Sequence, residues 1–290
     1  MHFVDAKGIL SAKNGMNIYR GCTHGCIYCD SRSECYQMNH AFEDIEVKQN
    51  CVTLLEKALQ SKRKKCMIGT GSMSDPYMHC EEKLELMRRC LEVIERYEFG
   101  VAVQTKSDRI LRDLQLLSKI NKNAKAVVQT TFTTYDEELC KLIEPNVCTT
   151  KKRFEMLLAM KEEGISTVVW IDPILPFIND TQENLDGLLE YCIQAKVKGV
   201  ICFGIGMTLR NGNREYFYQK LDEHFPGLRS KYQETYGHTY ELASPNARKL
   251  FQRLQTTCKA HNILCGPEEV FAYMHEFPQD KHYQQLSLFD

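Results

Sequence analysis

Three cysteines near the start of the chain carry the strongest chemical signal in the sequence. Residues 19–30 read Tyr-Arg-Gly-Cys-Thr-His-Gly-Cys-Ile-Tyr-Cys-Asp, so Cys22, Cys26 and Cys29 form a C-x3-C-x2-C pattern. Thiolates at this spacing can hold three corners of a metal cluster, and the neighbouring glycines let the backbone wrap around it. Structural zinc normally has four protein ligands. The pattern therefore predicts a four-iron cluster that keeps one iron open for a further ligand.

Two simpler interpretations of these cysteines remain open. His24 lies inside the loop and could complete a zinc site, although this spacing is unlike the usual paired zinc motifs. The cysteines could also be small buried side chains of the core. We favour the cluster, because buried cysteines have no need of this spacing among glycines.

Composition sets the context in which such a site would work. The chain has 290 residues, 43% hydrophobic and 26% charged, as in an ordinary folded protein. A chain of this length needs no disulfides, so most of its 14 cysteines are expected to be buried thiols in a reducing compartment. Without an apolar run of the length of a membrane span, or a signal-peptide pattern, we expect a cytoplasmic protein with no membrane partner. The net charge of −1 neither supports nor excludes nucleic acid as a substrate.

Short apolar runs alternate with amphipathic helical patterns before residue 204. The strand-like runs lie at residues 16–19, 66–68, 101–104, 126–130, 167–171 and 200–203. Helical patterns lie at residues 51–58, 84–94, 108–117, 136–143, 154–160 and 184–193. This alternation predicts an α/β fold with parallel strands covered by helices. Periodicity alone does not distinguish an open sheet from a barrel or a partial barrel.

The character of the sequence changes near residues 208–213. The following segment is aromatic and charged, with helical patterns at 214–223 and 246–260 and no clear strand. We therefore predict a helical C-terminal extension packed against the core. The expected organisation is a core at 1–210, the helical extension at 211–280 and a tail at 281–290.

The cysteine motif, its place after the first strand, and the aromatic Tyr28 before the last cysteine resemble the radical S-adenosylmethionine (radical SAM) superfamily. The resemblance implies that the three cysteines hold a [4Fe-4S] cluster whose fourth iron binds S-adenosyl-L-methionine (SAM) through its amino and carboxylate groups. It further implies that an external one-electron reductant drives reductive cleavage of SAM to methionine and a 5′-deoxyadenosyl radical, which abstracts hydrogen from the substrate. The protein would contribute a low cluster potential and shelter from water.

Further segments are similar to the spore photoproduct lyase-like branch of this superfamily, also described as DNA repair photolyase-like. These segments are Asn17–Cys22, Ser74–Tyr77, Thr105–Ser107, Glu144–Pro145, Asp172–Pro176 and Asn179–Asp180. They cover roughly residues 14–210, and the aromatic C-terminal region resembles one subgroup. The implied fold is a partial (β/α)6 barrel of the TIM type, with its active site at the C-terminal ends of the strands.

The same resemblance implies a set of cofactor-binding residues at the strand ends. The predicted residues are Tyr28, Gly71, Ser72, Ser74, Lys106 and Thr131. In the family, a lysine at the position of Lys106 pairs with the SAM carboxylate, and a hydroxyl at the position of Thr131 contacts the ribose. The simpler alternatives are an ordinary turn at residues 69–74, a solvated lysine, and a strand edge rich in threonine.

Two positions depart from the pattern of spore photoproduct lyase. Met73 stands where that enzyme has a cysteine that donates hydrogen to the product radical, and a thioether has no S–H to give. Asp30 stands where it has a tyrosine. We therefore expect a different route for hydrogen return, and the candidate donors, among which the sequence does not choose, are Tyr77, Cys80, Cys202 and Tyr28.

The tail predicts a binding partner. Residues Gln285, Leu286, Ser287, Leu288 and Phe289 resemble the peptide by which bacterial proteins bind the sliding clamp. Its apolar side chains would fill a groove on the partner, and the glutamine would supply orienting hydrogen bonds. The alternative is that the same side chains dock on the protein's own core.

Three functions are consistent with these residues. The leading hypothesis is a lyase-like radical SAM enzyme that processes lesions in nucleic acid, with DNA as the substrate. The second keeps the radical chemistry but acts on a peptide or a small molecule, because fold and cofactor do not specify the substrate. The third is a non-catalytic metal-binding module that recruits partners through its tail.

Overall fold

A parallel sheet forms the centre of the protein. The computed structural model describes residues 1–278, and its main sheet has seven strands in the order β12-β9-β8-β7-β6-β5-β2, with every neighbouring pair parallel. The strands are β2 (Gly15–Met16), β5 (Met67–Thr70), β6 (Gly100–Gln104), β7 (Ala126–Thr131), β8 (Ser166–Trp170), β9 (Gly199–Ile201) and β12 (Leu264–Cys265). The sheet confirms the predicted α/β partial barrel.

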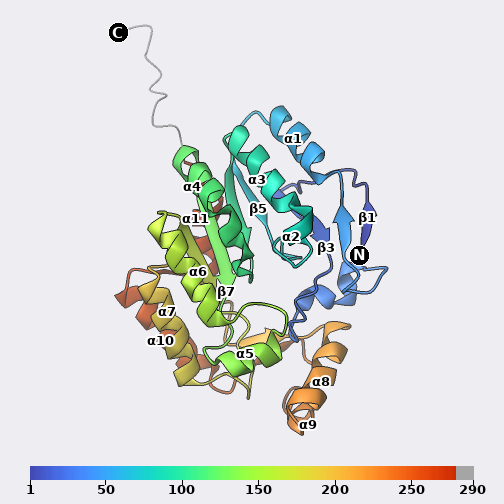
Figure 1. Cartoon of the computed structure of the whole chain (residues 1–290). Helices are drawn as coiled ribbons and strands as arrows, with labels where there is room; N and C mark the ends of the chain where they lie inside the picture. Colours follow the sequence, from blue (N-terminus) through green and yellow to red (C-terminus); the bar gives the residue numbers. More distant parts are fainter. Residues whose placement is uncertain (279–290) are drawn as a thin grey trace.

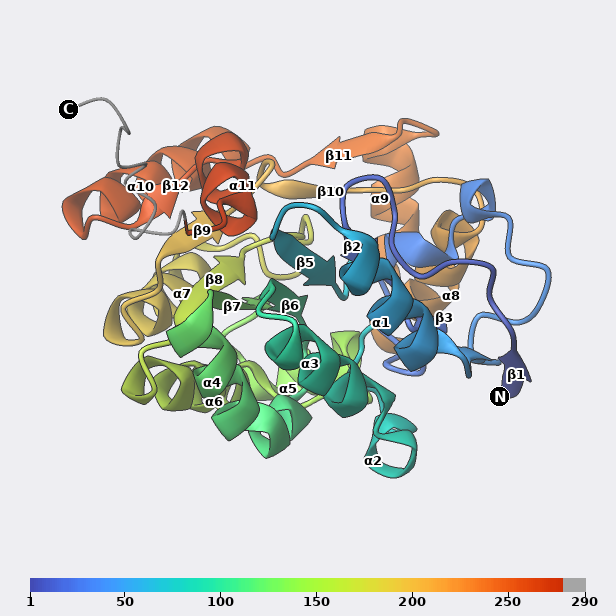
Figure 2. The same cartoon turned by 90° about the horizontal axis from the view of Figure 1, so that it is seen from above.

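Helices connect these strands and cover one side of the sheet (Figures 1 and 2). They are α1 (Cys51–Ser61), α2 (Glu81–Leu84), α3 (Leu86–Arg96), α4 (Leu114–Asn123), α5 (Glu137–Ile143), α6 (Thr150–Glu162) and α7 (Gln182–Gln194). The pattern at 108–117 divides into a 3-10 turn, η3 (Asp108–Asp113), and the start of α4. The predicted strand and helix positions after residue 50 are confirmed to within a few residues, except that Glu85 divides the pattern at 84–94 between α2 and α3. The single strand predicted at 16–19 is wrong, because Gly15–Met16 pairs in the main sheet and Tyr19–Arg20 pairs with Glu46–Lys48 in a separate sheet.

Successive side chains along each strand point to opposite faces of the sheet, so both faces carry apolar groups that pack against other elements. Val101 and Val103 point to the helices and join the large outer core, whereas Ala102 between them points to the inner face. Both faces are apolar, so the strands read as continuous hydrophobic runs, as expected for a parallel sheet covered on both sides.

Helix α11 (Pro267–His275) fills the inner face at the end of the sheet where the strands begin. Its Val270 and Met274 form a small core with Met67 and Val127 of the strands. A Cβ atom at Gly199 in β9 would lie 2.8 Å from the Val270 side chain, so a glycine permits this close approach. In Figure 2, α11 lies on the opposite side of the sheet from α3 and α4. The space above α11, toward the strand ends, remains for a ligand.

The C-terminal region is mainly helical but also contains strands. It contains β10 (Gly206–Thr208), α8 (Asn213–His224), α9 (Leu228–Tyr236), β11 (Glu241–Ala243), α10 (Ala247–Ala260), β12 and α11. β10 and β11 form an antiparallel pair, and β12 is the last strand of the main sheet. The expectation that no strand follows the core is therefore wrong, because these short strands have partners distant in sequence.

A second small sheet lies at the N-terminal side of the molecule. It consists of β1 (His2–Val4), β4 (Glu46–Lys48) and β3 (Tyr19–Arg20), in that order. The 3-10 turns η1 (Asp30–Arg32) and η2 (Glu34–Tyr36) connect the cysteine loop to this sheet.

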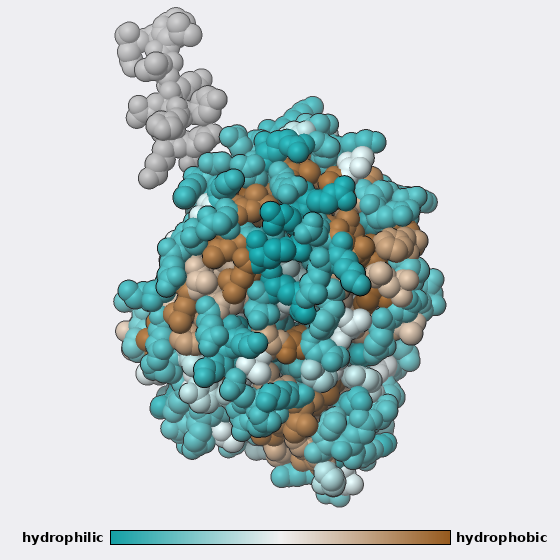
Figure 3. Space-filling view, in the orientation of Figure 1, coloured by the Kyte–Doolittle hydropathy of each residue, from teal (hydrophilic) through white to brown (hydrophobic). Residues whose placement is uncertain are grey.

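The face of the molecule seen in Figure 1 is mostly hydrophilic. Figure 3 shows teal side chains over most of the face seen in Figure 1, with brown apolar groups in the furrows between helices. Within residues 1–278, no helix has the length and apolar character needed to cross a bilayer. The predicted clamp-binding peptide at 285–289 lies outside the described residues.

Candidate functional site

The cysteine loop follows β3 at the end of the main sheet where the strands finish. Gly21 has a φ of +87°, and a Cβ atom there would lie 2.4 Å from the Phe42 carbonyl oxygen, so only glycine fits. The Cys22 amide donates a hydrogen bond to that same oxygen (3.0 Å). Local backbone geometry thus turns the chain so that Cys22, Cys26 and Cys29 follow one another around a tight loop.

The thiols of this loop have the properties of ligands of a metal cluster, and none of them forms a disulfide. Cys22 and Cys26 are buried, Cys29 is partly exposed, and all 14 cysteines of the chain are free. Burial raises the pKa of the Cys22 thiol to about 12 and raises that of Cys26 further. Thiols in this environment keep their protons unless a cation compensates the thiolate charge. The donor set therefore fits an iron–sulfur cluster, which supplies that charge.

A cavity of about 710 Å³ opens beside Cys29 and collects residues from the ends of successive strands. Its inner lining includes Tyr28, Cys29, Ser72, Met73, Gln104, Lys106, Thr131, Trp170 and Asp172. Its outer lining includes Tyr36, Phe203, Tyr240 and residues of β10 and β11. The cavity places the cysteine loop and most of the predicted cofactor residues around one space, at the end of the barrel where enzymes of this architecture perform chemistry.

Asp75 connects the cysteine loop to two strand ends. One of its carboxylate oxygens accepts hydrogen bonds from the Thr105 hydroxyl (2.7 Å) and the Tyr77 amide (2.8 Å). The other accepts from the Lys106 amide (2.7 Å) and lies 3.6 Å from Nδ1 of His24. Burial lowers the pKa of His24 to about 4, so the imidazole is neutral. His24 thus faces Asp75, in a position that supports the loop.

A buried ion pair fixes Tyr28. Its hydroxyl donates to the Glu144 carboxylate and lies 3.2 Å from the Thr133 hydroxyl. Glu144 is paired with Arg153, and both side chains are fully buried. Although burial alone raises the pKa of Glu144, the Arg153 charge outweighs it and lowers that pKa, so the carboxylate is ionised. Arg153 also donates to the Thr131 carbonyl (2.8 Å), which ties the end of β7 to the same network.

Lys106 is a cation in the lining of the cavity beside Cys29. Its ammonium lies 5.6 Å from the centre of the Tyr28 ring. Burial tends to lower the pKa of Lys106, but the nearby Cys26 and Glu144 outweigh this and raise it above its ordinary value. Lys106 is therefore a positive charge that faces the cavity, which is what a carboxylate ligand requires.

Some of the remaining predicted cofactor residues line the cavity, and others shape the loops around it. Ser72 and Thr131 line the cavity. Gly71 has a φ of +99°, and a Cβ atom there would lie 1.9 Å from the Gln104 carbonyl oxygen, so glycine is required for the turn. Ser74 does not line the cavity, because its hydroxyl donates to the Gly21 carbonyl at the base of the cysteine loop. Its contact with a cofactor stays a prediction.

The candidate hydrogen donors lie at different distances from the cavity. Tyr28 lines it, and Cys202 is buried next to its lining residue Phe203. Tyr77 is fully buried and donates to Asp113 (3.0 Å), and Cys80 lies near Tyr19 on the far side of the loop. Among these four residues, Tyr28 alone lines the cavity; Cys202 precedes the lining residue Phe203, but its side chain packs in the outer core.

Several functional candidates were not identified from the sequence. Asp75 and Glu144 stand in quoted motifs, but nothing in their spacing shows that they hold the loop. Asp172 also stands in a motif, and burial raises its pKa to about 7. Phe203 and Tyr240 are exposed aromatic residues on the rim, and only their apolar character in a polar context could have marked them.

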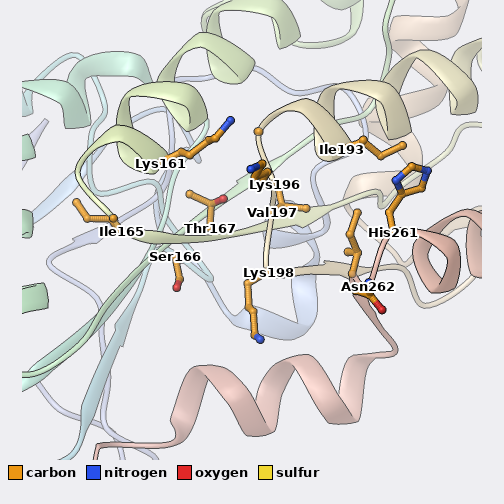
Figure 4. A pocket seen from close by; sticks show the side chains of 13 residues that line it. Lys161, Ile165, Ser166, Thr167, Ile193, Lys196, Val197, Lys198, His261 and Asn262 are labelled. Atoms are coloured by element: carbon orange, nitrogen blue, oxygen red, sulfur yellow. The ribbon is translucent and has the colours of Figure 1, made fainter.

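A second cavity of about 570 Å³ lies at the opposite end of the strands (Figure 4). Lys161, Lys196 and Lys198 line it together with His261. Its lining has no cysteine and no carboxylate, and Lys161 already donates to the Gln194 carbonyl (3.0 Å). The groups needed for the predicted chemistry are at the other end of the barrel.

Comparisons with known proteins show the family of the chain. A family model described as the Radical SAM superfamily matches residues 16–192. An uncharacterized protein of Mycobacterium tuberculosis is 29% identical over 227 residues, which cover 76% of this chain and 66% of that protein. An uncharacterized protein of Methanocaldococcus jannaschii is 32% identical over 176 residues, which cover 60% of this chain and 65% of that protein. The match thus spans just under two thirds of the length of these relatives.

Solved structures of spore photoproduct lyase share the fold. The complex with the dinucleoside spore photoproduct has a TM-score of 0.60 at 13% identity, covering 86% of this chain and 74% of that one. A variant with bound AdoMet and the same dinucleoside has a TM-score of 0.61. The family model covers more than half of the chain and includes all three loop cysteines. The chain belongs to the radical SAM superfamily of enzymes, whose members use S-adenosylmethionine and an iron–sulfur cluster.

Proposed function

We propose that this enzyme holds a [4Fe-4S] cluster on Cys22, Cys26 and Cys29 and acts on nucleic acid, with a damaged base in DNA as the favoured substrate. The observation that carries the proposal is the cavity beside Cys29, because it connects the cysteine loop and Lys106 to exposed aromatic rings. Free thiols throughout the chain favour a reducing compartment such as the cytoplasm, where an external one-electron donor would reduce the cluster.

The residues of the cavity have separate tasks in this proposal. When bound, the cluster and SAM supply a 5′-deoxyadenosyl radical that abstracts hydrogen. Lys106 binds the carboxylate of SAM, and Thr131 contacts its ribose. The Asp75 and Glu144 networks hold the loop in place, because their hydrogen bonds connect it to the ends of β6 and β7. Apolar walls limit the access of water to reactive species.

The rim of the cavity has the properties of a nucleobase site. Phe203 is 61% exposed and lies 6.0 Å from the Trp170 ring, and Tyr240 is 44% exposed. The Arg210 guanidinium lies 5.1 Å from the Tyr240 ring centre, donates to the Tyr240 hydroxyl (2.8 Å) and lies 3.8 Å from an Asp30 carboxylate oxygen, with which a phosphate would compete. Aromatic side chains that are open to solvent bind unstacked bases, with about 1–3 kcal/mol per stacked base. A neutral chain with such a local surface can still bind nucleic acid.

Cys202 is the favoured hydrogen donor, because it directly precedes the lining residue Phe203, although its side chain packs in the outer core. Its thiol lies 3.4 Å from the Gly204 carbonyl oxygen, and burial raises its pKa to about 12, so the S–H form persists. Met73 lines the cavity but has no such hydrogen. Cys202 therefore combines the correct chemical form with a position next to the lining.

Deuterium transfer tests the substrate class directly. Incubation of the cluster-loaded enzyme with SAM, reductant and DNA oligonucleotides deuterated in defined lesions should place deuterium in 5′-deoxyadenosine. Phe203→Ala should weaken oligonucleotide binding about tenfold, since one stacked base contributes on the order of 1–3 kcal/mol. Phe3→Ala is the matched control, because Phe3 is also exposed but lies away from the cavity.

The alternative substrate classes give different results in this assay. Transfer of label from a peptide or a small molecule, with none from any lesion, would replace nucleic acid as the substrate while leaving the radical chemistry in place. Cofactor cleavage that does not respond to any DNA would point the same way.

We also propose that residues Gln285–Phe289 bind the bacterial sliding clamp, which would bring the enzyme to replicating DNA. The support is the sequence pattern alone, in which the apolar residues Leu286, Leu288 and Phe289 follow a glutamine. Deletion of residues 285–290 should abolish capture by immobilised clamp and leave cluster content unchanged. Equal capture of the truncated and full-length chains would reject this partner.

A further inference from the structure

We propose a second metal site, separate from the cysteine loop, formed by His2, His40 and Glu46. One ligand atom from each of these residues lies within 4.8 Å of the other two. His2 belongs to β1, Glu46 to β4, and His40 to the segment between η2 and β4. The proposed ligand is a divalent transition metal, with zinc as the best match to two imidazoles and one carboxylate.

The register of the small sheet brings the ligands together. His2 and Glu46 are directly paired across the parallel strands β1 and β4. Nε2 of His40 lies 3.9 Å from a Glu46 carboxylate oxygen, and the His2 and His40 rings are 4.9 Å apart between their centres. Zinc bonds of about 2.0–2.1 Å in tetrahedral geometry would separate the donor atoms by about 3.3 Å. Small side-chain rotations are therefore enough to close the site.

In both histidines, Nδ1 already contacts an oxygen atom, as the nitrogen that does not bind the metal usually does in ligating histidines. Nδ1 of His2 lies 2.9 Å from an Asp44 carboxylate oxygen, and Nδ1 of His40 lies 3.0 Å from the Ala41 carbonyl oxygen. Both contacts orient the ring and leave Nε2 available as the metal ligand. Ligating histidines almost always bond a carboxylate or a carbonyl in this way.

His40 also has an unsatisfied atom at the proposed site. Its Nε2 is buried and makes no hydrogen bond within the described residues. A buried polar atom without a partner is costly, and each such atom calls for an explanation. A metal ion bound to Nε2 supplies that partner.

In the described part of the chain, the neighbouring cationic side chains do not form ion pairs with Glu46 that would block metal binding. Arg20 is paired with Glu46 across β3 and β4, but its guanidinium donates to the carbonyls of Tyr36 (2.8 Å) and Gln37 (3.0 Å). Lys48 lies two residues further along β4 and donates to the Asn17 carbonyl (2.9 Å). The Glu46 carboxylate therefore remains available to a metal ion.

The site would stabilise a segment that contacts the cysteine loop. His40 and Phe42 belong to one connection, and the Phe42 carbonyl accepts the hydrogen bond of the Cys22 amide. A metal at His40 would restrict the motion of this connection. With three protein ligands, the metal would complete its coordination with a water molecule.

Metal loading of the full-length, cluster-loaded chain tests the site. After exposure to zinc sulfate and removal of loosely bound ions, wild type should retain one more zinc per chain than His40→Gln or Glu46→Gln. His261→Gln is the matched control and should retain as much as wild type, because His261 is exposed and far from the group. A parallel arm with ferrous iron tests the other ion that two imidazoles and one carboxylate accept. Retention of extra iron instead of zinc would support the same site with a different metal.

Zinc-edge X-ray absorption of the wild type provides a readout that does not need the variants to fold. Nitrogen and oxygen neighbours at about 2.0–2.1 Å are expected, whereas sulfur neighbours at about 2.3 Å would assign the zinc to free cysteines. That sulfur signature, or equal zinc and equal iron retention in all four proteins, would overturn the proposal. Cluster content measured in the same samples separates this outcome from failure of the cysteine site.

Discussion

Lys106 has the position that its proposed role in binding the SAM carboxylate requires. A lysine after a strand is usually solvated, but here its ammonium approaches Tyr28 and faces the cavity. Lys106→Met should raise the KM for SAM about tenfold or more, because a hydrogen bond to a charged group contributes about 1.5–3 kcal/mol. Steady-state cofactor cleavage measures this. Lys161→Met, at the opposite end of the strands, is the control, and an unchanged KM in Lys106→Met would exclude the assigned role.

Asp172 provides a pH-dependent test at the same scale. Burial raises its pKa to about 7 from an ordinary value of 3.8, so the folded protein holds a proton that the unfolded chain releases. Stability is therefore lost as pH rises from about 4 to about 7. The side chain of Asp172→Asn cannot ionise, so this loss of stability is absent from the variant. The unfolding free energy of Asp172→Asn minus that of the wild type should therefore increase by about 1–2 kcal/mol between pH 5 and pH 8, after allowance for solvent in the cavity.

Urea denaturation at several pH values measures this difference. Asp5→Asn is the matched control, because Asp5 is exposed and lies outside the cavity lining. A difference for Asp172→Asn that stays flat across the same range would show that Asp172 ionises normally in the folded protein.

At this scale the sequence predicts the metal ligands but not the groups that hold them. The three cysteines are close in sequence, so their spacing reports directly on the loop. Asp75 bonds a residue 30 positions away, and Tyr28 bonds Glu144 at a separation of 116. Such partners are set by the fold, and no local pattern indicates them.

Among the elements, α11 has the least obvious role from the sequence. Its apolar residues Val270 and Met274 pack on the inner face of the sheet and close that end of the barrel interior. Met274→Ala should lower the unfolding free energy by about 2–4 kcal/mol, because a buried methionine would be replaced by a cavity. Glu269→Ala on the same helix is exposed and should change it by less than about 0.5 kcal/mol. Thermal or urea unfolding of both variants checks this, and equal losses would contradict the packing described for α11.

Element prediction succeeds where hydrophobic periodicity is local. The core strands from β5 to β9 and the helices between them follow from apolar runs and helical spacing. The strands β11 and β12 do not, because they are three and two residues long and depend on partners far along the chain. The 3-10 turn η3 also interrupts a pattern that looks like a single helix.

On the scale of the whole molecule, the site depends on both the barrel and the C-terminal region. The cavity lining runs from Tyr28 to Ala247, so β10, β11 and the start of α10 form part of its wall. Helices α8 and α9 pack against Ile27 and Tyr28 of the cysteine loop through Phe217 and Tyr232. The sequence predicts an extension packed on the core, but only the structure shows that it encloses the reaction space.

Anaerobic loading with iron and sulfide tests the central claim most directly, with Cys22→Ala as the test variant. Cys35→Ala is the control, because Cys35 is exposed and outside the motif. Wild type and Cys35→Ala should each bind about four iron and four sulfide ions and release 5′-deoxyadenosine from SAM on reduction, whereas Cys22→Ala should release none. A wild-type protein that stays colourless without acid-labile sulfide, or a Cys22→Ala protein with full cofactor cleavage, would contradict the account.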